Sequence, residues 1–209
     1  MSIRFPRIAI LFLACGLPLR ADVEVKGVLV HSGFNNNPGM EKVIEGSVSF
    51  IVNVPLETIV THLEDASSLG RLSSNIVEYK ASKILDENSR SHYAVEEDVV
   101  PTEGLFGIGK LAVTKLHLLM MVDRSMGSEE IRITWRLNPE KPQTWDRFEG
   151  RIVGFNLNDG HSIFMVKSSS QSRYDIPDGI KRKLVDHHLG KIKDNIVKWI
   201  ENFGTPAEK

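Results

Sequence analysis

The sequence predicts an α+β fold with an antiparallel sheet of about seven strands, two short helices after the first of them, and one long C-terminal helix. Two observations predict this fold. Between residues 44 and 174, short segments of alternating apolar and polar residues follow one another, separated by turns of a few residues. From about Asp178 to Phe203, apolar residues instead recur at helical spacing. Because the turns are short, we expect consecutive strands to be antiparallel neighbours.

The strand that begins at Ile44 shows the alternation most clearly. Every second residue from Ile44 to Val54 is apolar or glycine, and most residues between them are polar, so one strand face is polar. Pro55 suits the first position of a helix that ends near Leu63, and a second short helix is expected around residues 66–72. We expect further strands at residues 76–85, 91–100, 111–122, 130–137, 145–157 and 162–174, and a leading strand near residues 23–30.

The C-terminal helix has one strongly apolar side. At 100° per residue, Leu184 and His188 lie at the border of this side. The large apolar residues within it are Val185, Leu189, Ile192, Ile196, Trp199, Ile200 and Phe203. Their burial is worth on the order of 10 to 20 kcal/mol gross, so packing must hold this helix in place. Its opposite, basic side is interpreted as a solvated face, with docking on anionic lipid headgroups as the alternative.

The first 21 residues are typical of a secretory signal peptide. Arg4 and Arg7 precede an apolar run over residues 8–19, and Ala21 offers a small residue at a cleavage site. An exported protein, periplasmic or extracellular, is therefore expected. Cys15, the only cysteine, follows Leu13 and Ala14 in a pattern similar to a bacterial lipobox, so a lipoprotein is the alternative, and an uncleaved anchor is a third. Residues 22–42 are expected to form a strand and loop extension, residues 43–203 one domain, and residues 204–209 a disordered tail.

Composition and motifs argue against several classes of protein. Without residues 1–21 the chain carries 23 basic and 27 acidic residues, a net charge of −4 that disfavours nucleic acid as a partner. The seven histidines include no pair at the four-residue spacing of a helical metal site, so neither a metal nor another cofactor is expected. No Gly-x-Ser-x-Gly motif is present, and the sequence identifies no catalytic residue.

Strand 91–100 holds the most informative polar residue. Its alternation places Tyr93, Val95 and Glu97 on the face that should point inward. An inward carboxylate needs a partner, for which Arg132 and Arg136 are the candidates. The alternative is that Glu97 anchors a ligand hydroxyl or acts as a general acid or base.

An apolar interior is expected around Glu97. The residues predicted to line it are Tyr93, Val95, Glu97, Leu116, Leu118, Met120, Ile133, Trp135, His188, Ile192 and Trp199. A ligand cavity and a closely packed core have the same composition, so both interpretations stay open. In the glycine-rich loop over residues 101–110, the apolar residues Leu105, Phe106 and Ile108 form either a gate over a cavity mouth or a loop tip folded onto the sheet.

Over residues 43–203 the chain resembles the START-like superfamily, also called SRPBCC, which includes lipid-transfer domains, polyketide cyclases and pollen-allergen-like proteins. The resemblance lies in the order of elements, in residues 52–59 at the first strand end, in Trp145 to Gly150 and Asn158-Asp159-Gly160, and in Ile176-Pro177 before the long helix. It implies a helix-grip fold, in which a curved sheet wraps the C-terminal helix and leaves an apolar cavity. The superfamily shares no single catalytic motif, so the resemblance implies no catalytic residue.

Three functional hypotheses follow. The first is non-catalytic binding of a lipid or other hydrophobic small molecule in an internal cavity, with transfer between membranes through transient membrane contact. The second is a cyclase or aromatase that uses Glu97 or a cavity histidine for proton transfer. The third is an envelope protein-interaction module with a collapsed cavity and a protein-binding loop at Leu105, Phe106 and Ile108. Neither the ligand nor the oligomeric state can be read from the sequence.

Overall fold

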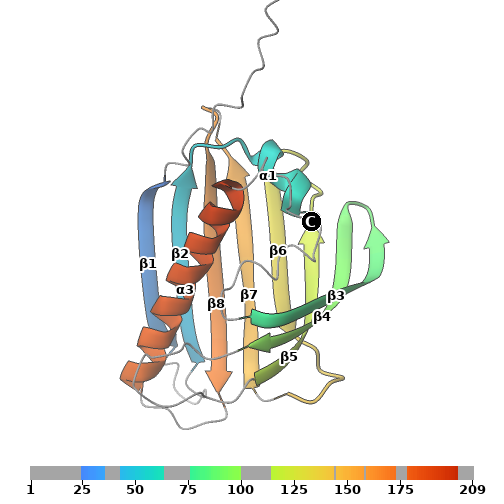
Figure 1. Ribbon diagram of the computed structural model, residues 1–209, viewed down its shortest axis with the longest axis vertical. Helices are drawn as coiled ribbons and strands as arrows, with labels where there is room; N and C mark the ends of the chain where they lie inside the picture. The colour runs from blue at the N-terminus through green and yellow to red at the C-terminus, as the bar shows by residue number, and fades with distance from the viewer. Residues whose placement is uncertain are drawn as a thin grey trace, which may run out of the picture.

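An eight-stranded antiparallel sheet with helices on one of its faces forms the body of the protein (Figure 1). This computed structural model describes residues 25–35, 43–63, 76–99, 114–143, 145–157, 159–172 and 178–201. The strands are β1 (Val25–Asn35), β2 (Val43–Val52), β3 (Ile76–Glu87), β4 (Arg90–Val99), β5 (Thr114–Asp123), β6 (Glu130–Leu137), β7 (Trp145–Asn156) and β8 (Ser162–Ser172). The helices are α1 (Leu56–Leu63) and α3 (Asp178–Glu201). Along the sheet the strands lie in the order β1-β2-β8-β7-β6-β5-β4-β3.

The sheet contains eight strands rather than the expected seven, because β1 belongs to it. β1 pairs with β2 in antiparallel register from Val25 opposite Val52 to Asn35 opposite Val43. Gly27 adopts a φ of 61°, and the register shifts between Lys26 and Leu29. Such a bulge interrupts the two-residue period, which explains why the sequence shows this strand only weakly. The second short helix, expected around residues 66–72, lies outside the described residues.

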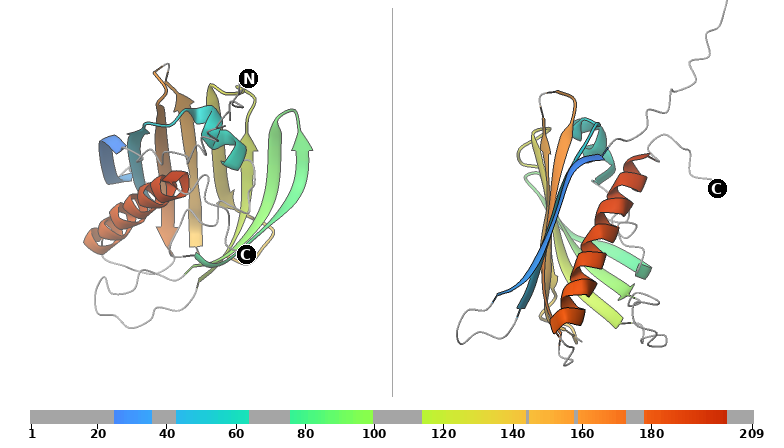
Figure 2. Two further views of the ribbon diagram at one scale, coloured as in Figure 1. Left: turned by 45° about the horizontal axis from the view of Figure 1, so that its top comes forward. Right: turned by 90° about the vertical axis from the view of Figure 1, so that its left-hand side faces the viewer.

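α3 and α1 lie on the same side of the sheet, which we call the inner face (Figure 2). α3 packs mainly against β2 and β1. Its side chains Leu189, Ile192, Ile196 and Ile200 are buried, as the apolar stripe predicts. Facing them, buried apolar side chains run along alternate positions of the strands, such as Val48, Phe50 and Val52 of β2 and Phe164 and Val166 of β8. The hydrophobic core therefore lies between the inner face and the helices.

A glycine brings α1 close to the sheet. A Cβ atom at Gly154 would lie 2.9 Å from Cε1 of Phe164 and 3.0 Å from Cδ1 of Leu56, so only glycine leaves room for this packing. Leu56 and Ile59 of α1 are fully buried. Phe164 also stacks on Phe50, with ring centroids 5.7 Å apart. These contacts fix the end of the core at which β2 passes into α1.

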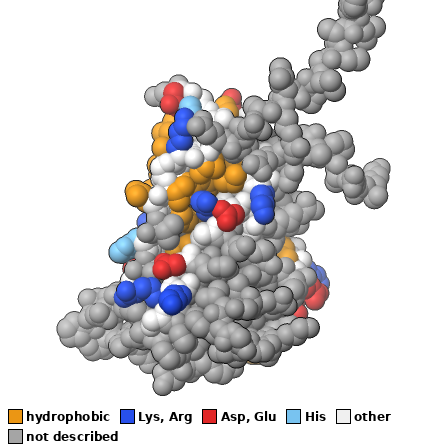
Figure 3. Space-filling view, turned by 60° about the vertical axis from the view of Figure 1, so that its left-hand side comes forward, with side chains coloured by type: hydrophobic (Ala, Val, Ile, Leu, Met, Phe, Trp, Pro, Cys, Tyr) orange, Lys and Arg blue, Asp and Glu red, His pale blue; other side chains and the backbone are white. Residues whose placement is uncertain are grey.

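Some hydrophobic side chains remain exposed at the border of the sheet. Val28 and Leu29 lie on β1, on the side of the molecule that Figure 3 shows, and Ile84 and Leu85 lie on β3 at the opposite border. Within the described ranges, no helix combines the length and the apolar character that crossing a membrane requires.

Candidate functional site

On the central strands, the residues predicted to line the apolar interior all point their side chains to the inner face. Tyr93 of β4 lies opposite Met120 of β5, which lies opposite Trp135 of β6. In the neighbouring row, Val95 lies opposite Leu118. Leu116 and Ile133 complete the group on these strands, and all of these side chains are buried or, for Trp135, partly buried. The structure thus brings together eight of the eleven residues in one apolar surface, counting Glu97, and Ile192 reaches the same core from α3.

Glu97 lies within this apolar surface. Its neighbours across the ladder are Tyr79 of β3 and Leu116 of β5, neither of which carries a positive charge. The residue is 8% exposed, and it makes no ion pair or hydrogen bond in the described structure. Burial raises the pKa of the Glu97 carboxyl to about 7. A large fraction of the carboxyl groups is therefore protonated near neutral pH and can donate a hydrogen bond.

The expected cationic partners of Glu97 point the other way, and that expectation is wrong. On β6 the buried inner residues are Ile131 and Ile133, so Arg132 and Arg136 project from the opposite, outer face. Arg132 forms an ion pair with Glu130 there. The two-residue period of β6 separates both arginines from the Glu97 carboxyl.

The inner face holds further polar atoms without partners. Nε1 of Trp135 is buried and has no hydrogen-bond partner in the described structure. The indole ring covers Gly150 of β7, where a Cβ atom would lie 2.3 Å from Cζ2 of Trp135. An indole N–H can only donate a hydrogen bond, so the partner that Trp135 lacks would be an acceptor, such as an oxygen atom of a ligand.

Serines of β8 add hydroxyl groups to the same face. Ser168 lies between Gly46 and Gly150, and Ser170 lies between Ile44 and Phe148. Both serines are buried. The sequence signal that could have identified them is the pairing of Ser168 with two glycines, which a single strand does not reveal.

Several predicted residues cannot be placed. Leu105, Phe106 and Ile108, the candidate gate, lie outside the described residues, and so do Cys15 and residues 1–21. His188 and Trp199 are part of α3, but their side chains are not among those described. Across the described parts of the chain, no three His, Cys, Asp or Glu side chains are grouped as a metal site would require.

The comparisons with known proteins support the fold. No protein-family model matches the chain, and no curated protein matches it. Among solved structures, human StAR-related lipid transfer protein 5 aligns with a TM-score of 0.61 at 12% identity, covering 88% of this chain and 88% of that one. A STAR-related lipid transfer protein from Xanthomonas axonopodis aligns with a TM-score of 0.57 at 10% identity, covering 86% and 99%.

An enzyme also shares the architecture. The Zhui aromatase/cyclase from Streptomyces sp. R1128 aligns with a TM-score of 0.53 at 11% identity, covering 77% of this chain and 94% of that one. At such identities the likeness concerns the fold alone. The chain has the START-like fold that its order of elements predicts.

Proposed function

We propose that the protein binds a predominantly apolar small molecule, most simply a lipid, non-covalently against the inner face of the sheet. The observation that carries the proposal is the Glu97 carboxyl, which lies within a buried apolar surface and has no partner among the described residues. A folded chain gains nothing from a carboxyl without a partner in such a place, because its burial disfavours the charged form. A ligand hydroxyl or carbonyl oxygen would supply the missing hydrogen bond.

The surroundings of Glu97 fit such a ligand. The inner face around it is apolar, and Met120, about 13 Å away along the strands in the row of Tyr93, adds a flexible side chain that adapts to different shapes. Nε1 of Trp135 offers a second donor. Transfer of the bound molecule between membranes is the extension of this proposal, and two structural neighbours are named as lipid transfer proteins.

Lipid extraction and native mass spectrometry test the proposal. We expect protein purified from its own envelope to carry a hydrophobic molecule, and delipidated protein to gain thermal stability when that molecule is returned. Glu97→Gln should change the affinity for it, whereas Glu96→Gln should not, because the neighbouring Glu96 side chain is 52% exposed on the outer face. Protein that carries no such molecule and is stabilised by no extracted lipid would contradict the proposal.

A second candidate function is that of a cyclase or aromatase. The pKa of about 7 for Glu97 suits a general acid or base, which works best when its pKa lies near the working pH. An enzyme should convert its bound molecule to a product of different mass or absorbance. Loss of that conversion in Glu97→Gln, with binding retained, would favour the enzyme over the carrier. If the unaltered protein neither binds nor converts any small molecule, the protein-interaction module would be the remaining hypothesis.

Export belongs to the same proposal. We infer that residues 1–21 direct the chain out of the cytoplasm and are removed, because a basic start and a short apolar run precede Ala21. N-terminal sequencing of the mature protein should begin at Asp22. A lipid-modified N-terminus at Cys15 would establish the lipoprotein alternative instead.

A further inference from the structure

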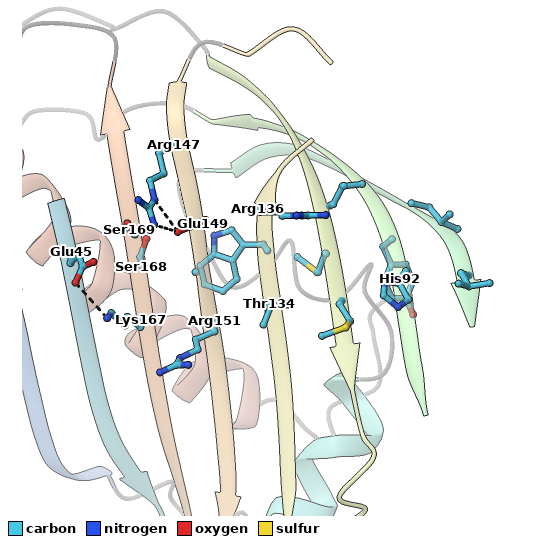
Figure 4. Close-up of a pocket in the computed structure, with 18 residues that line it drawn as sticks. Glu45, His92, Thr134, Arg136, Arg147, Glu149, Arg151, Lys167, Ser168 and Ser169 are labelled. Atoms are coloured by element: carbon cyan, nitrogen blue, oxygen red, sulfur yellow. Dashed lines mark hydrogen bonds and ion pairs between the residues drawn. The ribbon is translucent and has the colours of Figure 1, made fainter. Parts of the chain in front are cut away.

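A recess of about 740 Å³ lies on the outer face of the sheet (Figure 4), and Glu97 is not among the residues that line it. It runs across the strands between two rows of side chains. One row contains Glu45, Ser169, Glu149, Arg136 and Leu119, and the other contains Lys167, Arg151, Thr134, Met121, His92 and Leu85. The row between them, which includes Gly150 and Trp135, points its side chains to the inner face, so its backbone forms the floor. We call this recess the outer trough.

The shape of the outer trough suits an extended ligand. The two rows are two residues apart along each strand, which places them about 7 Å from each other. From β2 to β3 the trough crosses adjacent strands spaced about 4.8 Å apart, so its length is on the order of 30 Å. A single extended chain fits these dimensions, whereas a compact ring system would leave most of the length empty.

The middle of the outer trough is positively charged. Arg147 forms an ion pair with Glu149 through Nε at 2.9 Å, and Nζ of Lys167 lies 3.4 Å from Oε2 of Glu45. These two contacts occupy both carboxylates that line the trough. Two further cations, Arg136 and Arg151, remain.

Arg136 and Arg151 face each other across the trough without a partner. Arg136 lies opposite Glu149, and Arg151, two residues further along β7, lies opposite Thr134, so the two arginines are diagonal neighbours in different rows. Their Cβ atoms are therefore about 7 to 8 Å apart. Neither guanidinium makes an ion pair or hydrogen bond in the described structure, and Figure 4 shows them on the two sides of the trough. An anion between them would relieve their mutual repulsion and accept charge-assisted hydrogen bonds from both.

The β3 end of the outer trough is mostly apolar, with His92 of β4 between Met121 and Leu85. Leu119 and Met121 of β5 are partly buried there, while Ile84 is 59% exposed and Leu85 44% exposed. The ladder between β3 and β4 shifts register between Lys83 and Leu85, which lets both apolar side chains line the trough. Exposed apolar surface that continues from a cationic pair indicates a ligand with two chemically different parts.

We propose that the outer trough is a second binding site, specific for a single-chain anionic amphiphile. The carboxylate or phosphate head group binds between Arg136 and Arg151, and the alkyl tail lies along Leu119, Met121 and Leu85. The site requires no ligand on the inner face, so it stands independently of the function proposed above. Because the trough is narrow, it fits a single amphiphile in solution better than the surface of a membrane. Because one end of the trough is apolar, it differs from a site for an acidic peptide.

The test uses n-octyl phosphate as the probe and isothermal titration calorimetry on the full-length protein. The double variant Arg136→Gln/Arg151→Gln should weaken binding at least tenfold, because it removes both head-group contacts. The control Arg132→Gln, on the same face of β6 but outside the trough, should bind as the unaltered protein does. Met121→Gln, which alters only the tail contact, should weaken octyl phosphate binding severalfold and leave inorganic phosphate binding unchanged. Circular dichroism and thermal unfolding establish that each variant folds.

Each alternative gives a different result. Unchanged affinity in the double variant overturns the proposal, and so does inorganic phosphate that binds as tightly as octyl phosphate, since the tail would then contribute nothing. Loss of binding in Glu97→Gln would place the probe on the inner face instead. Binding of poly-glutamate, or of vesicles containing anionic phospholipid, with no binding of monomeric octyl phosphate would assign the trough to a peptide or to a membrane surface.

Discussion

The buried carboxyl of Glu97 should make the stability of the folded chain fall as the pH rises. Burial raises the pKa of this group from its ordinary 4.5 to about 7, and no charged side chain faces it from β3 or β5. Between these two values the folded chain retains a proton that the unfolded chain has released. Stability is therefore complete below pH 4.5, declines as the pH rises, and reaches its lower level above about pH 7.

The magnitude follows from the two pKa values. Each tenfold change in proton affinity corresponds to about 1.4 kcal/mol, so the whole effect is about 3 kcal/mol, of which about 2.5 kcal/mol falls between pH 5 and pH 8. Glutamine has nearly the same shape and no charge. Glu97→Gln should therefore lose this part of the pH dependence and be more stable than the unaltered protein at pH 8.

Urea unfolding of delipidated protein at pH 5 and pH 8 measures the effect. With a denaturant slope of about 2 kcal/mol per molar, the midpoint of the unaltered protein should fall by about 1 M more than that of Glu97→Gln. Other titrating groups contribute equally to both proteins and cancel in the difference. Glu96→Gln is the matched control and should follow the unaltered protein. Equal pH dependence in Glu97→Gln and the unaltered protein would refute the reasoning that this carboxyl is buried without a partner.

Three further predictions concern packing and can be measured by denaturant unfolding. Gly150→Ala should destabilise the fold by about 3 kcal/mol, because its Cβ atom would lie 2.3 Å from the Trp135 ring and 2.5 Å from the carbonyl oxygen of Lys167; a cost below about 1 kcal/mol would show that the ring moves freely. Gly190→Ala in α3 meets no atom within 4 Å and should stabilise by about 0.5 to 1 kcal/mol, so a loss of stability would contradict the packing of that helix. Phe164→Ala should cost about 3 to 5 kcal/mol, since it removes a buried ring stacked on Phe50, and a smaller loss would mean that the core collapses into the space.

The sequence predicted those features that depend on local periodicity. Alternation in β4 correctly placed Tyr93, Val95 and Glu97 on one buried face, because a strand with one buried face must repeat every two residues. The apolar stripe likewise predicted the burial of Leu189 and Ile192 in α3. The eighth strand was not counted, because the bulge at Gly27 disturbs its period.

Features that depend on register between strands escaped prediction. The expectation that Arg136 reaches Glu97 was a local error instead, because the alternation of β6 alone directs this side chain to the outer face. The burial of Ser168, by contrast, could not be predicted from its own strand, because its pairing with Gly46 and Gly150 is set by three strands together. The outer trough, which brings residues from seven strands into two rows, could not be recognised from any single segment. The role of the inner-face residues as a ligand site stays a prediction.

Among the described strands, the sheet ends at β1 on one border and at β3 on the other. An uninterrupted border strand would offer its free amide and carbonyl groups to a neighbouring molecule and so promote polymerisation. Here each border departs from regular geometry, at Lys26 to Leu29 in β1 and at two places in β3. These distortions twist the borders away from the flat form that such stacking requires. The irregular borders thus protect concentrated protein from aggregating edge to edge, even though Leu29 is 72% exposed.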